Sequence, residues 1–77
     1  MMRVTVKIYG LSGVIIRELS LPEGATCASA LERVLLGEKD PPVLSNLSYM
    51  LNGQRAGADT RLSQGDTVIV LSALAGG

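Results

Sequence analysis

The sequence contains no histidine, tryptophan or phenylalanine, a single cysteine and only two tyrosines. Without histidine, a Ser-His or Cys-His nucleophile pair and a histidine metal site cannot form within this chain. The lone Cys27 excludes an internal disulfide and a zinc site of the multi-cysteine kind. We therefore expect no bound metal or cofactor, and a protein that is not itself an enzyme.

The chain has no net charge, because its Lys and Arg residues total seven and its Asp and Glu residues also total seven. Phosphate-backbone binding needs a surplus of cations, so nucleic acid is not an expected partner. No segment approaches the ~20 apolar residues of a membrane helix, and the N-terminus lacks the apolar core of a signal peptide. These absences predict a cytoplasmic protein with no membrane partner.

What the chain does have is a clear strand pattern at its N-terminal end. Residues 3–8 alternate polar and apolar side chains, which predicts a strand with one buried face. Residues 14–21 predict a second strand, joined to the first as a hairpin. Arg17 falls in the apolar phase of that strand, so we expect either a β-bulge or an arginine stem lying along the surface.

A helix is predicted over residues 28–36, with Thr26 as its N-cap. Gly37 fits the C′ position, where left-handed backbone favours glycine. One helical face collects the apolar side chains Cys27, Leu31, Val34 and Leu35. We therefore interpret Cys27 as a small buried hydrophobe and not as a persulfide relay.

The second half of the chain predicts shorter strands, at residues 48–51, within 54–59 and at 67–73. The last strand is apolar on both faces, which indicates a central strand. Its second face is then either covered by a loop or left as an apolar patch for a partner. The element order predicts a small α+β domain, a mixed sheet of four to five strands packed on one main helix.

The printed chain ends in Gly76-Gly77. Two residues without Cβ atoms form a thin strip of backbone that can enter a channel too narrow for side chains. Extended residues 74–77 would reach at most ~13–14 Å. We expect a folded domain over residues 1–73 and a flexible tail over residues 74–77 that presents the Gly77 carboxylate.

Four segments in this order resemble one family: LPEGAT at residues 21–26, LNG at 51–53, LSQGDTV at 62–68, and the final Gly-Gly. The family is that of the ubiquitin-like β-grasp sulfur carriers, which includes the molybdopterin synthase small subunit and the thiamine-biosynthesis sulfur carrier. The resemblance implies that an E1-like adenylating enzyme joins Gly77 to AMP using ATP. A sulfur donor such as a cysteine desulfurase then converts the adenylate to a thiocarboxylate, and a partner such as a larger synthase subunit uses the sulfur.

The resemblance assigns the chemistry to Gly77 and assigns partner contacts to Gly76, Ala75, Leu74, Ala73 and Leu71. The ending over residues 72–77 favours the molybdopterin type, with the thiamine type and other sulfur pathways left open. Two other functions also remain open. One is a ubiquitin-like modifier conjugated to proteins through Gly77, and the other is a β-grasp binding module that uses no tail chemistry.

Overall fold

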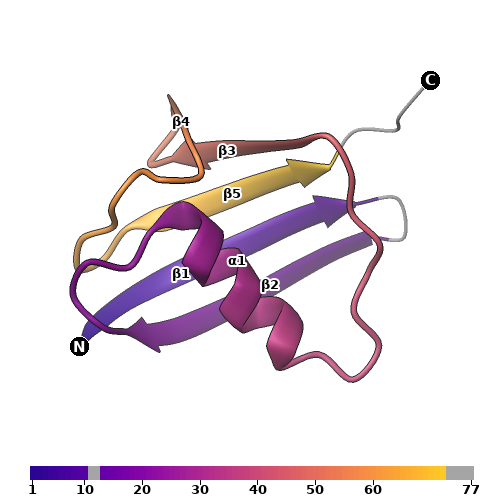
Figure 1. The fold of residues 1–77 in the computed structure, drawn as a ribbon, viewed down its shortest axis with the longest axis horizontal. Coiled ribbons are helices and arrows are strands. Elements are labelled where there is room, and N and C mark those ends of the chain that lie inside the picture. The colour runs from indigo at the N-terminus through magenta and orange to yellow at the C-terminus, as the bar shows by residue number, and fades with distance from the viewer. Residues whose placement is uncertain (11–12, 73–77) are drawn as a thin grey trace.

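The structure is a computed structural model that describes residues 1–10 and 13–72. Its elements are β1 (Met2–Gly10), β2 (Gly13–Leu21), α1 (Cys27–Leu36), β3 (Leu47–Leu51), β4 (Gln54–Ala56) and β5 (Thr67–Ser72). The strands form one sheet in the order β2-β1-β5-β3-β4, and α1 lies across one of its faces (Figure 1). This arrangement confirms the predicted α+β, β-grasp fold class.

The first and last strands lie side by side at the centre of the sheet. β1 and β5 run parallel, whereas β1–β2, β3–β4 and β3–β5 are antiparallel. The β5 strand is therefore central, as its two-faced apolar pattern predicted. Parallel pairing places Leu71, near the end of β5, opposite Tyr9, near the hairpin end of β1.

The β1–β2 hairpin contains no bulge, because its register is continuous from Met2↔Leu21 to Gly10↔Gly13. Of the two alternatives for Arg17, the surface one is confirmed. Its guanidinium contacts Glu38 at 2.9 Å (Nη2 to Oε2) and donates to the Ile16 carbonyl oxygen at 2.8 Å. Arg17 thus lies among the apolar residues of the helix-facing side of β2, while its guanidinium bonds to Glu38 in the segment that follows the helix.

Helix α1 begins with the predicted cap. The Ser29 N–H donates to Thr26 Oγ1 at 3.2 Å, and the Thr26 N–H donates to Ser29 Oγ at 2.7 Å, so two end amides are satisfied reciprocally. The predicted left-handed backbone at Gly37 is wrong, because its φ is −84°. Its N–H bonds back to the carbonyls of Arg33 and Val34 instead, so the last helical turn closes without a reversal.

The core lies between α1 and the sheet. Its buried residues are Met2, Val4, Val6, Ile8, Leu21, Ala25, Cys27, Ala30, Leu31, Val34, Leu62, Val68 and Val70. Cys27 is fully buried, which confirms its interpretation as a small hydrophobe. No polar or charged side chain is buried among the residues that the structure describes, so the core is held by apolar contacts alone.

Candidate functional site at the end of the central strand

The candidate site begins where β5 ends. This strand pairs with β1 on one side and with β3 on the other, so its last described residues are held from both sides. Leu71 lies opposite Tyr9 in β1 and Ser48 in β3. The chain after Ser72 therefore continues from a strand that is paired on both sides.

A pair of serines fixes this end further. The Ser45 N–H donates to Ser72 Oγ at 3.0 Å, and the Ser72 hydroxyl donates to the Ser45 carbonyl oxygen at 3.0 Å. The two bonds tie the loop before β3 to the final residue of β5. Sequence analysis missed this contact, because serines 27 positions apart carry no pattern that pairs them.

The face of the sheet opposite the helix carries an apolar patch. Side chains alternate along a strand, so the residues between the buried positions of β1 and β5 point away from α1. We define the apolar patch as Tyr9, Val14, Ile16, Met50, Ile69 and Leu71, which are neighbours by strand register. Tyr9 and Leu71 are each 39% exposed, and Val14 and Ile16 are 51% and 53% exposed. Of the two alternatives for the second face of β5, the described residues support an uncovered apolar patch.

Of the site residues predicted from the sequence, only Leu71 lies within the described part of the chain. Leu71 lies in the apolar patch, so the structure joins it to neighbours from β1 and β2 that the sequence had not assigned to a site. Ala73, Leu74, Ala75, Gly76 and Gly77 lie outside the described residues. The role of Gly77 and the tail over residues 74–77 therefore stay predictions.

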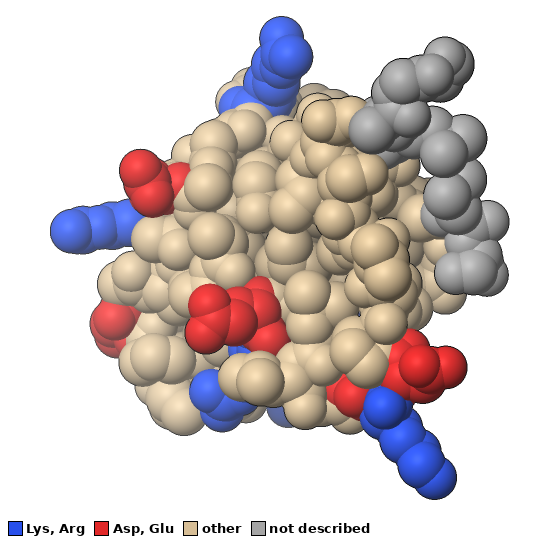
Figure 2. Space-filling model, turned by 45° about the vertical axis from the view of Figure 1, so that its right-hand side comes forward, with Lys and Arg blue, Asp and Glu red and all other residues tan. Residues whose placement is uncertain are grey.

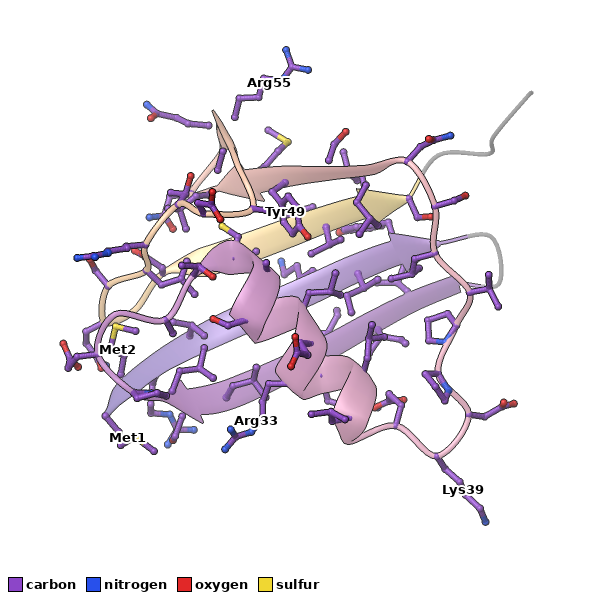
Figure 3. All side chains as sticks on the ribbon, in the orientation of Figure 1. Met1, Met2, Arg33, Lys39, Tyr49 and Arg55 are labelled. Atoms are coloured by element: carbon purple, nitrogen blue, oxygen red, sulfur yellow. The ribbon has the colours of Figure 1, made fainter. Side chains whose placement is uncertain are left out.

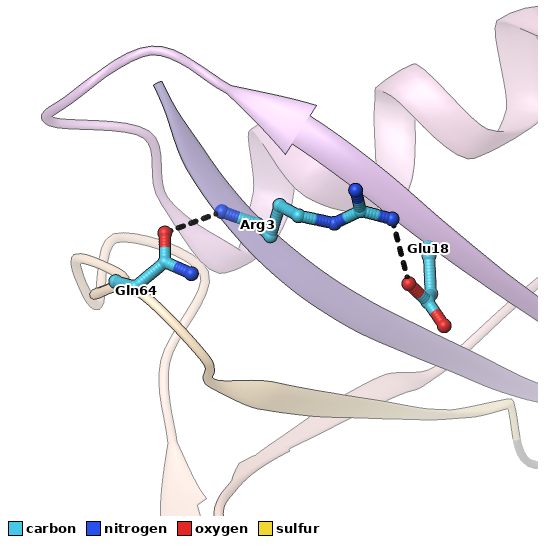
Figure 4. A network of polar contacts seen from close by, with 3 residues as sticks. All are labelled: Arg3, Glu18 and Gln64. Carbon is cyan, nitrogen blue, oxygen red and sulfur yellow. Dashed lines mark hydrogen bonds and ion pairs between the residues drawn. The ribbon is translucent and has the colours of Figure 1, made fainter.

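Polar contacts flank the patch at the other end of the same face. Arg3 Nη2 lies 2.9 Å from Glu18 Oε1, and the Arg3 backbone N–H donates to Gln64 Oε1 at 2.9 Å (Figure 4). In the view of Figure 2, charged side chains of both signs are scattered, and neither sign forms a continuous surface. The face seen in Figure 2 thus gives no indication of a charged docking surface.

The two titratable groups with shifted pKa values, Cys27 and Tyr49, are both held in their protonated forms. Burial raises the pKa of the Cys27 thiol, and the Asp66 carboxylate adds to the rise, so the reactive thiolate is disfavoured. Burial likewise raises the pKa of Tyr49, whose ring lies over the helix-covered side of the sheet (Figure 3). Within residues 1–10 and 13–72, no group of three or more His, Cys, Asp or Glu side chains could hold a metal ion. No described helix is long and apolar enough to cross a membrane.

A groove of about 490 Å³ lies beside α1 and is lined by residues that include Leu21, Arg33 and Leu36. Leu21 pairs with Met2, at the opposite end of β1 from Tyr9 and the patch. The groove is therefore separate from the end of β5.

A mixed five-stranded sheet on one helix, with the last strand at its centre, defines this chain as a ubiquitin-like β-grasp protein. Solved structures from three archaea share the fold. Small archaeal modifier protein 1 of Haloferax volcanii is 14% identical with a TM-score of 0.74, over 96% of this chain and 100% of that one. A candidate molybdopterin converting factor, subunit 1, of Pyrococcus furiosus is 26% identical with a TM-score of 0.72, over 96% and 100%.

The Caldiarchaeum subterraneum ubiquitin is 18% identical with a TM-score of 0.64, over 99% of this chain and 98% of that one. No family model matches the chain, and no curated protein matches its sequence. These likenesses confirm the predicted fold. The neighbours are consistent with the β-grasp sulfur carrier family that the sequence resembles.

Proposed function

We propose that this protein is a sulfur carrier, a co-substrate whose reacting group is the Gly77 carboxylate. The observation that carries the proposal is the end of β5: the central strand leads from the core toward residues 73–77 beside an exposed apolar patch. The Pyrococcus furiosus neighbour supports the molybdopterin type, because it aligns with nearly the whole chain at 26% identity.

The chemistry requires activation, since a carboxylate is a poor electrophile. An E1-like enzyme would join a Gly77 carboxylate oxygen to the α-phosphorus of ATP and release pyrophosphate. Hydrosulfide would then attack the acyl carbon, AMP would leave with that oxygen, and loss of a proton would give the thiocarboxylate. Where the donor is an enzyme persulfide, the attack gives an acyl disulfide, and a second thiol reduces it to the thiocarboxylate while forming a disulfide.

In this proposal the folded domain binds the partner, and the C-terminal tail carries the reacting group. The apolar patch would let a partner bind the domain by burying hydrophobic surface. The tail would then enter the partner's active site, where Gly76 adds no Cβ to obstruct a narrow channel. Bases and metal ions for the reaction come from the partners, which include the adenylating enzyme, a sulfur donor such as a cysteine desulfurase and a larger synthase subunit.

The test is intact mass spectrometry after incubation with ATP, an E1-like adenylating enzyme and sulfide. We expect one oxygen of the C-terminal residue to be replaced by sulfur. A variant lacking Gly76 and Gly77 is the control and should gain no sulfur. Gly76→Val should fold normally but react far more slowly, because its β-branched side chain blocks a narrow channel. Full reactivity of Gly76→Val would contradict the channel, and an unchanged mass of the intact protein would contradict the carrier function.

A second function is conjugation to other proteins, which the shared fold with the Haloferax modifier and the Caldiarchaeum ubiquitin keeps open. Both functions would begin with the same adenylate of Gly77. They differ in product, because conjugation gives heavier isopeptide-linked species and sulfur transfer does not. Denaturing electrophoresis of the same reaction, supplied with candidate target proteins, separates the two.

A further inference from the structure

One cation lies inside the apolar patch. Lys7 in β1 is paired by register with Ile16 on one side and with Ile69 on the other. It is neither fully buried nor fully exposed, which fits a stem packed between apolar neighbours and an ammonium group in water. Because β1 is an interior strand, Lys7 does not serve to protect a sheet edge from pairing.

Lys7 is also unpaired within the part of the chain that the structure describes. The two ion pairs there join Arg3 to Glu18 and Arg17 to Glu38. Glu18 lies on the same face as Lys7, but its carboxylate is held by Arg3 (Figure 4). Arg55, opposite Met50 at the far side of the patch, extends away from the sheet (Figure 3) and likewise has no ion pair in the described structure.

We propose that Lys7 selects the docking partner: an activating enzyme whose contact surface is apolar and carries a carboxylate opposite Lys7. The proposal rests on the proposed carrier function. A partner that covers the patch removes water from Lys7, and an ammonium group left without a partner there opposes binding. A carboxylate at that point forms a charge-assisted hydrogen bond, and Arg55 at the rim adds attraction during approach. Purely apolar surfaces are thereby rejected.

The first experiment tests the chemistry of the surface without any enzyme. Nuclear magnetic resonance titrations compare 4-phenylbutyrate with 4-phenylbutanol, which share an aryl chain and differ in the carboxylate. We expect both to shift the amide signals of Lys7, Tyr9 and Ile69, with a Kd about threefold or more lower for the carboxylate at low salt. Lys7→Met should abolish that difference. Equal Kd values in the unmodified protein, or the same difference in Lys7→Met, would overturn the proposal.

The second experiment measures the KM of an E1-like adenylating enzyme for the carrier. Lys7→Glu should raise KM by about 30-fold or more and Lys7→Met by about three- to tenfold, with kcat nearly unchanged. The matched control is Lys39→Glu, which makes the same charge reversal in the loop after α1 (Figure 3) and should change KM less than about twofold.

Thermal unfolding of each variant establishes that it is folded before its KM is interpreted. Equal KM values for Lys7→Glu and Lys39→Glu would refute the selection by Lys7 while leaving the carrier function intact. If the enzyme fails to adenylate the unmodified protein, the carrier function fails, and the titrations still decide whether Lys7 gives the patch its preference for a carboxylate.

Discussion

The two faces of the central strands differ sharply, although they are built from alternate residues of the same segments. On the helix side, Val6, Val68 and Val70 are 0% exposed. On the other side, Tyr9 and Leu71 are each 39% exposed. The helix-covered face is fully buried in the core, whereas the other face keeps part of its apolar surface in water and contributes less to stability. This difference in exposure is the basis for the proposal that the open face is a docking surface.

The largest expected effect comes from placing the same charge on each face of β5. Val70→Asp buries a carboxylate without a partner, at a cost of ~5 kcal/mol or more. A domain of this size has about 4–12 kcal/mol of total stability, so Val70→Asp should lose a large share of it and unfold at a much lower temperature. Leu71→Asp, one residue further, should fold and lose less than about 1 kcal/mol.

Circular dichroism with thermal unfolding measures both variants. A Val70→Asp variant as stable as Leu71→Asp, or an unfolded Leu71→Asp, would show that the two faces do not differ as their exposure indicates. Leu71→Asp should additionally weaken binding to the adenylating enzyme, which separates its binding role from any role in stability.

Sequence alone predicted the helix-covered face well, because alternation in β1 and the Thr26 cap are local signals. It predicted less of the exposed face. Ile69 and Leu71 were identified from the two-faced last strand, but Tyr9 and Val14 join them only because β1 lies between β2 and β5. Strand order is a long-range property that no local pattern carries.

A second comparison uses isoleucines on opposite faces. Ile8 is 1% exposed and Ile16 is 53% exposed. Ile8→Ala leaves a cavity against the helix and should lower the free energy of unfolding by about 2–5 kcal/mol. Ile16→Ala removes side-chain area that is largely in water and should cost below about 1 kcal/mol. Denaturant unfolding measures both, and costs within experimental error of each other would contradict the assignment of the two faces.

A third, smaller effect is the pH dependence of stability that comes from Cys27, which is buried on the helix-covered side of the sheet. Burial raises the pKa of its thiol in the folded state, so the unfolded chain loses this proton at lower pH. Above about pH 8.5, the unfolded state binds fewer protons than the folded state, and stability should fall by up to ~1.4 kcal/mol per pH unit. Below that pH the contribution is fully present. Cys27→Ala should lack this part of the pH dependence, and parallel stability curves for the two proteins would contradict it.

The smallest expected effect compares the two ion pairs, one on each side of the sheet. Arg3 and Glu18 on the open face have side chains that are 68% and 66% exposed, so their attraction is strongly screened. Arg17 and Glu38 lie on the helix side, where the Glu38 side chain is only 19% exposed and accepts from two guanidinium nitrogens of Arg17.

Double-mutant cycles should give a coupling below about 0.5 kcal/mol for the Arg3–Glu18 pair and about 0.5–1 kcal/mol for the Arg17–Glu38 pair. Raising the salt concentration should weaken the first pair more, because its charges are more open to counterions. Equal couplings would mean that the helix side shields charges no better than the open face, and would leave apolar burial as the property that distinguishes the two faces.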